Sequence, residues 1–347
     1  MRIAIVGLKG SGKSTIFSSL TGMTDDDPHD RGGKRIGTVK VPDERVDELA
    51  SIHKPKKTTY AEIVFTDQNT AAEPSGSWLS PAAASEFRAA DVLAAVLRSF
   101  ENPALPEAAN PVAEFQAIEE EFILGDLAQV EKRLERIDKE KGTGREKEAL
   151  LACHAHLDAS KPLRTLDLSE NQWDLLRGYA FLSQKNILVI VNTPEQDPKF
   201  MPEQLAPLLD EAGSTAMSLC GTMEAEIAAL PPDEQTEFLA DLGVETSARH
   251  RFIKMAHDAL NLISFLTGGP DECRAWSIKR GTKAREAASV IHSDIARGFI
   301  RAEVVSFEDF KTAGGSEKQA RAAGRYRLEG KEYEVQDGDI INFRFNV

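Results

Sequence analysis

The sequence predicts an α/β protein built around a phosphate-binding loop, and three observations support this. A short apolar run at residues 3–6 leads directly into the pattern G-x-x-x-x-G-K-[ST], which is completed by Gly7, Gly12, Lys13 and Ser14. Further along, a long segment rich in Glu, Lys and Arg interrupts the alternation of strands and helices. Short strand-like stretches then return near the end of the chain. We therefore expect a P-loop domain, a helical insertion and a small C-terminal α+β module.

The glycine loop has the context that its pattern requires, because a strand precedes it and a helix over residues 15–20 follows it. Its backbone N–H groups and the start of that helix are suited to a polyphosphate. Lys13 is expected to bind the β- and γ-phosphates, and the Ser14 hydroxyl is expected to bind Mg²⁺. The residues expected to contact the phosphates are Gly7, Lys9, Gly10, Ser11, Gly12, Lys13, Ser14 and Thr15.

Three more apolar runs predict parallel strands of the same sheet, over residues 61–66, 90–97 and 187–191. A short helix is expected over residues 45–52. Asp67 follows the first of these strands, where a P-loop protein places its Mg²⁺-side aspartate. Asp67 is therefore the second expected metal residue, and it is expected to contact a Mg²⁺-bound water. The polar, Asp-rich segment from residue 24 to 34 is interpreted as a loop beside the phosphates.

Residues 108–183 are expected to form a helical hairpin inserted into the α/β domain. Leu127, Val130, Leu134 and Ile137 repeat at spacings of three and four residues, which is typical of a coiled-coil seam. A Gly-Thr-Gly break at residues 142–144 allows the chain to return. A capping-box pattern that begins at Ser169 then predicts another helix, which should extend to residue 183.

The last part of the chain, residues 264–347, is expected to be a separate α+β module. Strands are predicted over residues 326–328, 333–335 and 340–345, and a helix over residues 284–291. The predicted division is therefore 1–107 with 184–263 for the P-loop domain, 108–183 for the insertion and 264–347 for the C-terminal module.

Composition excludes some classes of function. The 347 residues carry a formal net charge of −14, which argues against general affinity for DNA or RNA phosphates, and sequence-specific DNA binding is not expected. No apolar run approaches the length of a membrane span, and the first residues lack signal-peptide anatomy. The three cysteines are far apart and show no metal-ligand spacing, which fits free thiols in a reducing compartment. A cytoplasmic location is the expectation.

The chain resembles the YchF (Obg-like ATPase) family of translation-factor-class P-loop proteins over nearly its whole length. The matching segments are Gly7-Leu8 with Gly12-Lys13-Ser14-Thr15, Val41-Pro42-Asp43, Arg98 to Asn102, Asp126 to Leu134, Arg274-Ala275-Trp276, Ile291 to Asp294, Gly298 to Val304 and Leu328 to Val347. This resemblance implies an Obg-like G domain, a coiled-coil hairpin and a C-terminal TGS module with a β-grasp fold. It also implies association with ribosomes.

The resemblance further implies that ATP is preferred over GTP. The family has N-x-x-E in place of the guanine-reading N-K-x-D, and Asn192 and Glu195 fit that variant, so both are expected to contact the base. The aspartate of the usual motif accepts hydrogen bonds from guanine, and the change removes that pairing. GTP remains the alternative nucleotide.

The chain also departs from the family pattern at elements that support hydrolysis. The middle of the loop reads Lys9-Gly10-Ser11, Thr70 replaces a switch glycine, and Arg31 stands where the family has a Mg²⁺-sensing threonine. The segment after Asn102 lacks the histidine that the family offers for catalysis, so the catalytic residues are unknown. Such losses should reduce turnover more than binding.

The sequence therefore predicts an ATP-binding NTPase with weak or partner-stimulated hydrolysis, which acts as a ribosome-associated switch. A nucleotide-binding adaptor or scaffold without hydrolysis is the alternative. A small-molecule kinase is a third reading, suggested only by the wording of the glycine loop.

Overall fold

A computed structural model describes residues 1–23, 34–68, 78–141, 143–231, 234–235, 239–240 and 246–346. By its contacts the chain divides into two compact units. The first contains residues 1–39 and 64–252, and the second contains residues 40–63 and 253–347. The three-part division expected from the sequence stays a prediction. Arg31 and Thr70, on which the expected switch changes depend, lie outside the described residues.

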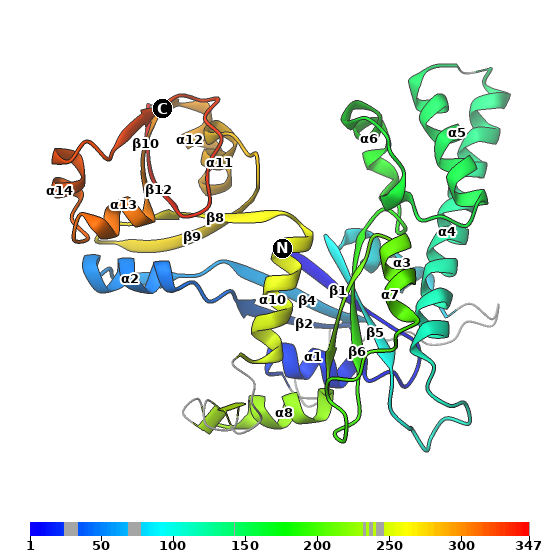
Figure 1. The fold of residues 1–347 in the computed structure, drawn as a ribbon. Coiled ribbons are helices and arrows are strands. Elements are labelled where there is room, and N and C mark those ends of the chain that lie inside the picture. The colour runs from blue at the N-terminus through cyan, green and yellow to red at the C-terminus, as the bar shows by residue number, and fades with distance from the viewer. Residues whose placement is uncertain are drawn as a thin grey trace. The chain divides into compact units, whose positions relative to one another are not determined.

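The first unit contains a six-stranded sheet in the order β2-β4-β1-β5-β6-β7 (Figure 1). The central pairs β4–β1, β1–β5, β5–β6 and β6–β7 are parallel. The strands are β1 (Arg2–Val6), β2 (Lys34–Lys40), β4 (Glu62–Gln68), β5 (Val92–Arg98), β6 (Asn186–Asn192) and β7 (Thr215–Leu219). The predicted strands over residues 3–6, 61–66, 90–97 and 187–191 are thus confirmed, whereas β2 and β7 were not predicted.

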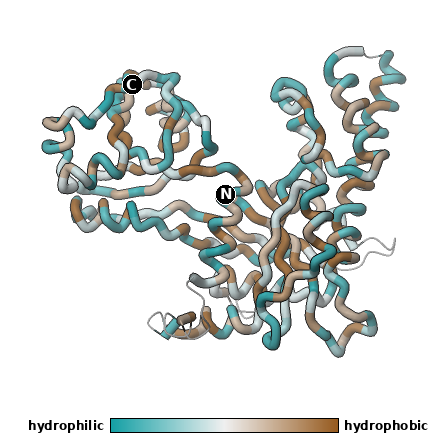
Figure 2. The backbone as a smooth tube through the Cα atoms, viewed as in Figure 1, coloured by the Kyte–Doolittle hydropathy of each residue, from teal (hydrophilic) through white to brown (hydrophobic). Residues whose placement is uncertain are grey.

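The inner strands are apolar on both faces because helices cover both sides of a parallel sheet. Every residue of β5 is buried, and Figure 2 shows the matching band of apolar backbone. One face packs against α3 (Pro81–Ala89), the start of α4 (Pro111–Lys139) and α7 (Leu205–Glu211). Elsewhere in the unit, α1 (Lys13–Thr21) packs against α8 (Gly221–Ala229), and Phe252 of α10 (Ala248–Ala259) contacts Phe65 of β4.

The helical hairpin is formed by α4 and α5 (Arg145–Asp158), which lie side by side in Figure 1. Val130, Leu134 and Ile137 of α4 pack with Leu150 and Cys153 of α5, so the predicted seam is confirmed. The capping box at Ser169 is also present. Its helix is shorter than predicted, because α6 (Glu170–Leu176) ends in a single 3₁₀ turn and Ala180 adopts a left-handed conformation, φ 48°.

The second unit contains a mixed six-stranded sheet in the order β11-β10-β12-β8-β9-β3. Its strands are β3 (Lys57–Thr59), β8 (Leu262–Thr267), β9 (Glu272–Lys279), β10 (Phe299–Ser306), β11 (Arg327–Glu329) and β12 (Asp339–Phe345). Its helices are α2 (Glu44–His53), α11 (Ala284–Ile291), α12 (Ser293–Arg297), α13 (Phe307–Thr312) and α14 (Glu317–Ala322). The predicted helices at 45–52 and 284–291 and the strands at 326–328 and 340–345 are confirmed.

The strand predicted over residues 333–335 is wrong. Only one isolated bridge, between Lys283 and Glu334, joins this segment to a neighbour. The Tyr333 hydroxyl donates to Asp339 at 2.7 Å, and Val335 N donates to the Thr282 carbonyl at 3.0 Å. These bonds bend the segment into the turn before β12 instead of pairing it along a strand.

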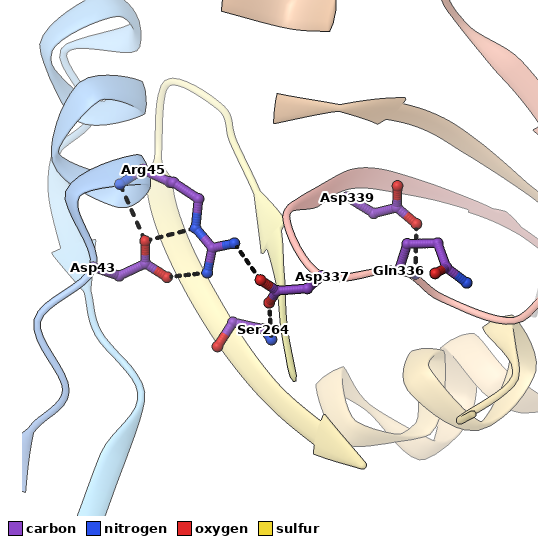
Figure 3. A network of polar contacts seen from close by, with 6 residues as sticks. All are labelled: Asp43, Arg45, Ser264, Gln336, Asp337 and Asp339. Atoms are coloured by element: carbon purple, nitrogen blue, oxygen red, sulfur yellow. Dashed lines mark hydrogen bonds and ion pairs between the residues drawn. The ribbon is translucent and has the colours of Figure 1, made fainter. Parts of the chain in front are cut away.

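A polar network holds α2 to the turn that precedes β12 (Figure 3). The Asp43 carboxylate caps α2 and receives three hydrogen bonds from Arg45, at 2.8 to 3.1 Å. The Arg45 Nη1 group also donates to Asp337 at 2.9 Å, and Asp337 accepts from Ser264 N at 2.8 Å. The segment between β2 and β4 is therefore fixed within the second unit by charge-assisted bonds.

Candidate functional site

The glycine loop connects β1 to α1, and the left-handed conformation of Gly12 starts the helix. Gly12 has φ 89°, a conformation that L side chains rarely adopt, and a Cβ atom there would overlap the Asn192 amide. Gly10 has φ 80°, and a Cβ atom there would overlap the Leu105 side chain. Backbone conformation and close neighbours therefore both favour glycine at positions 10 and 12, two of the predicted phosphate-binding residues. The N-terminus of α1 and the loop N–H groups suit an anion.

Asn192 fixes the loop to the end of β6. Its Nδ2 group donates to the Ser11 carbonyl at 3.0 Å, and its Oδ1 atom accepts from Gly221 N at 3.0 Å. The side chain is buried, so both bonds are shielded from water. Asn192 thus joins the loop, β6 and the start of α8. Its expected contact with a base stays a prediction.

Lys13 lies along the loop from which it is expected to bind phosphate. Its Nζ group donates to the carbonyls of Gly7 at 2.8 Å and Leu8 at 3.0 Å. Burial lowers the pKa of Lys13, while the negative charges of Asp67 and Glu114 act in the opposite direction. A partly buried ammonium at the start of a helix is a charge that a polyanion would stabilise.

Ser14 and Asp67 lie close together, as a shared metal role would require, with the Ser14 hydroxyl 3.4 Å from Asp67 Oδ2. The same Oδ2 atom accepts a hydrogen bond from Arg35 Nη2 at 2.7 Å, in an ion pair whose side chains are only 3% and 8% exposed. Mg²⁺ requires oxygen ligands with little tolerance in geometry. This donor set does not fit a Mg²⁺ ion held by Asp67, because a fixed cation already contacts the carboxylate. Sequence reasoning missed Arg35, which lies on a strand that was not predicted.

The remaining predicted loop residues differ in exposure. Lys9 is exposed, Ser11 is buried, and Thr15 borders the cavity described next. Among the residues that the structure describes, no group of three or more His, Cys, Asp or Glu side chains is arranged to hold a metal ion. No helix in the described part of the chain is long and apolar enough to cross a membrane.

A cavity of about 340 Å³ adjoins the loop where the base of a bound nucleotide is expected. Gly12 and Glu195 both line this cavity. A residue expected to contact phosphate and a residue expected to contact the base therefore lie at the same cavity. The Glu195 carboxylate accepts a hydrogen bond from the Thr222 hydroxyl at 3.0 Å. The full lining is Gly12, Thr15, Phe100, Asn192, Thr193, Pro194, Glu195, Gln196 and Thr222. Phe100 and Thr222 had no sequence signal as base-side residues.

The segment after β5 packs against the glycine loop. Asn102 Nδ2 lies 3.5 Å from the Gly10 carbonyl, and Leu105 contacts the Gly10 backbone region. Arg98 at the end of β5 is buried and donates to the carbonyls of Glu107 and Ala108 at 2.8 and 3.2 Å. Asn102 of the Phe-Glu-Asn sequence at 100–102 thus lies against the loop, together with Leu105.

Both the C-terminal segment of the chain and the chain as a whole are similar to known proteins. Residues 262–346 match the YchF-GTPase_C family, described as a protein of unknown function (DUF933). A "Ribosome-binding ATPase YchF" of Bacillus subtilis is 37% identical, over 99% of this chain and 98% of the relative. The protein of that name from Escherichia coli O157:H7 is 36% identical over 100% and 99%. "Obg-like ATPase 1" of Oryza sativa subsp. japonica is 36% identical over 100% and 92%.

Solved structures agree with these sequence relatives. The YchF GTPase of Schizosaccharomyces pombe superimposes with a TM-score of 0.85, at 28% identity over 99% of this chain and 97% of that one. A GTP-binding protein from Pyrococcus horikoshii OT3 has a TM-score of 0.62 at 19% identity, a likeness of fold. Because named YchF relatives are 36–37% identical to this chain over almost its full length, the chain belongs to the YchF family.

Proposed function

We propose that this chain binds ATP at the glycine loop and acts as a ribosome-associated NTPase with slow or partner-stimulated hydrolysis. The observation that carries the proposal is the loop itself, in which the Lys13 ammonium lies 2.8 Å from the Gly7 carbonyl at the start of α1. Its lowered pKa means that the charged form is disfavoured in place, and a triphosphate would compensate that cost. Ser14 is the loop residue whose hydroxyl would face a Mg²⁺ ion carried by the nucleotide.

The base-side cavity supports ATP over GTP. Glu195 stands in the sequence where the guanine-reading motif has its aspartate, and its carboxylate accepts a hydrogen bond from the Thr222 hydroxyl at 3.0 Å. Phe100 offers an aromatic face that is indifferent to the identity of a purine. The N-x-x-E sequence therefore lacks both the aspartate and the lysine of the guanine-reading motif, because Thr193 stands where that motif has lysine.

Ribosome association is proposed from the names of the full-length relatives, the ribosome-binding ATPases of Bacillus subtilis and Escherichia coli O157:H7. It would place the protein in the cytoplasm. Co-sedimentation of the purified chain with ribosomes, with and without ATP, tests this part of the proposal. Equal amounts of chain in the pellet with and without ribosomes would contradict it.

Nucleotide binding is tested by calorimetry of the purified chain with ATP and with GTP. We expect ATP to bind more tightly than GTP, and Lys13→Ala to weaken ATP binding by about 10- to 100-fold, the loss of charge-assisted bonds to phosphate. Lys132→Ala, which removes an exposed lysine from the helical hairpin, is the charge-matched control. Unchanged ATP affinity in Lys13→Ala would contradict the assignment.

Hydrolysis is tested in the same preparations by single-turnover phosphate release. We expect slow release from the chain alone and faster release when ribosomes are added. Release that stays at the level of a Lys13→Ala control under both conditions would contradict the NTPase part of the proposal.

A further inference from the structure

Arg35 is a buried cation that contacts Ser14 and Asp67 in the proposed nucleotide site. None of the roles expected from the sequence was assigned to it. Its side chain is 3% exposed, and its guanidinium lies 4.6 Å from the centre of the Phe17 ring. Its Nη2 group donates to Asp67 Oδ2 at 2.7 Å and to the Ser14 carbonyl at 3.3 Å. The guanidinium therefore contacts both residues expected on the Mg²⁺ side of the site, Ser14 through its backbone carbonyl and Asp67 through its carboxylate.

The chemistry of these contacts differs from that of an ordinary surface ion pair. An arginine cannot lose its proton in a protein, and its planar group is held between an aromatic ring and a carboxylate. The pair is shielded from water, so the Asp67 charge is compensated by a fixed partner. A divalent cation that approached Asp67 would find the Oδ2 atom already hydrogen-bonded to Arg35. It would also be repelled by the positive charge of the Arg35 guanidinium.

We propose that Arg35 replaces the divalent cation as the partner of Asp67, so that this chain binds nucleoside triphosphate with an affinity that depends little on Mg²⁺. The inference rests on the proposed function, because it concerns the cation requirement of the same site. It departs from the Mg²⁺ role that the sequence suggests for Asp67. Arg35 acts here as a positioning residue through Asp67 and Ser14.

The first test needs no variant. ATP affinity of the full chain is measured by calorimetry in millimolar Mg²⁺ and again with EDTA in place of the cation. We expect the two dissociation constants to agree within about threefold, whereas a loss of about tenfold or more in EDTA would overturn the inference. Absence of ATP binding in both buffers would contradict the proposed function and, with it, this inference.

The second test asks whether Arg35 is the cause. In Arg35→Met, which keeps an apolar stem beside Phe17 but removes the charge, we expect Mg²⁺ to strengthen ATP binding by about tenfold or more. In the double variant Arg35→Met with Asp67→Asn, both buried charges are gone together, and we expect the Mg²⁺ dependence to be small again. If the single variant folds poorly, the first test still decides the inference, because it needs no variant.

Arg133→Met is the matched control, because it removes an arginine that is ion-paired with Glu146 at 3.0 Å on the helical hairpin. It should show the same weak Mg²⁺ dependence as the unmodified chain. A Mg²⁺ dependence in Arg35→Met no larger than in Arg133→Met would overturn the role of Arg35. The ratio of affinities with and without cation is the deciding readout, since a purely structural role would lower both affinities alike.

Discussion

Two cations in the first turns of helices, Lys13 of α1 in the first unit and Arg45 of α2 in the second, have opposite electrostatic surroundings. Burial lowers the pKa of Lys13, and the Lys13 ammonium bonds only to neutral carbonyls among the hydrogen bonds described for it. The pKa of Arg45 is raised, first of all by its hydrogen bonds to Asp43, and Asp337 adds to the effect. One cation is therefore destabilised by its place in the fold, whereas the other is stabilised.

The difference fits the proposed ligand-binding role of Lys13 and a structural role of Arg45. Titratable groups that a protein holds in an unfavourable state gather at functional sites, whereas charges that are fully paired more often stabilise structure. Arg45 joins the cap of α2 to the turn before β12 and needs no further partner to do so (Figure 3). A polyanion bound beside Lys13 would offset the cost of burying its charge.

The most severe test of this view alters the loop without touching its charge. Gly12→Ala should reduce ATP affinity by about 100-fold or more, because the left-handed backbone and the overlap with the Asn192 amide would both force the loop to move. Calorimetry measures the loss. Gly178→Ala is the matched control, since a Cβ atom at Gly178 meets nothing within 4 Å, and it should bind ATP normally.

A reciprocal pair of variants sharpens the comparison most directly. Arg45→Met should lower the free energy of unfolding by about 1–2 kcal/mol, because its side chain is mostly buried and two carboxylates lose their partner. Its ATP affinity should not change. Lys13→Met should show the reverse, with ATP affinity lost and stability unchanged or slightly raised.

Urea denaturation gives the free energy of unfolding of each variant, and calorimetry gives the ATP affinity of each. The comparison fails if Lys13→Met destabilises the chain as much as Arg45→Met does. It also fails if Arg45→Met weakens ATP binding.

The smallest expected effect concerns pH. The folded-state pKa of Lys13 lies below 10.5, so its charged form lowers the free energy of unfolding at neutral pH, and this penalty disappears as pH rises through the folded pKa toward 10.5. The proposed contact of Lys13 with the phosphates requires the charged form. ATP affinity should therefore begin to fall at a pH below 10.5, and we expect an initial loss of about threefold. Lys13→Arg should remove this decline, because arginine keeps its charge at these pH values. A decline of the same size in Lys13→Arg would assign it to another group.

The parts of the fold that local patterns determine were predictable. The strand–loop–helix at the start, the seam through Val130 and Leu134, and the helix over 284–291 follow from spacing over a few residues. The strands β8, β9 and β10 were not predicted, because their burial alternates irregularly and depends on partners far along the chain.

The candidate site shows the same division. Lys13 and Ser14 are identified by a local motif, but Arg35 reaches Asp67 across 32 residues of sequence, and no short pattern encodes that pair. β2, which carries Arg35, contains a glycine and two lysines and lacks a clear apolar alternation. Asn192 was predicted from its motif, yet its role as a latch on the loop emerges only from the bonds to Ser11 and Gly221.

The placement of α2 has a consequence for how the chain is made. Val46 and Leu49 of α2 are buried among residues of the C-terminal part, such as Phe307 and Phe310, and Arg45 is separated from Asp337 by 292 residues. During synthesis the nascent chain must present this helix long before its packing partners leave the ribosome. Its apolar face then needs temporary protection, because exposed surface of this kind promotes aggregation. Segments synthesised after residue 262 thus complete the burial of a helix that ends at residue 53.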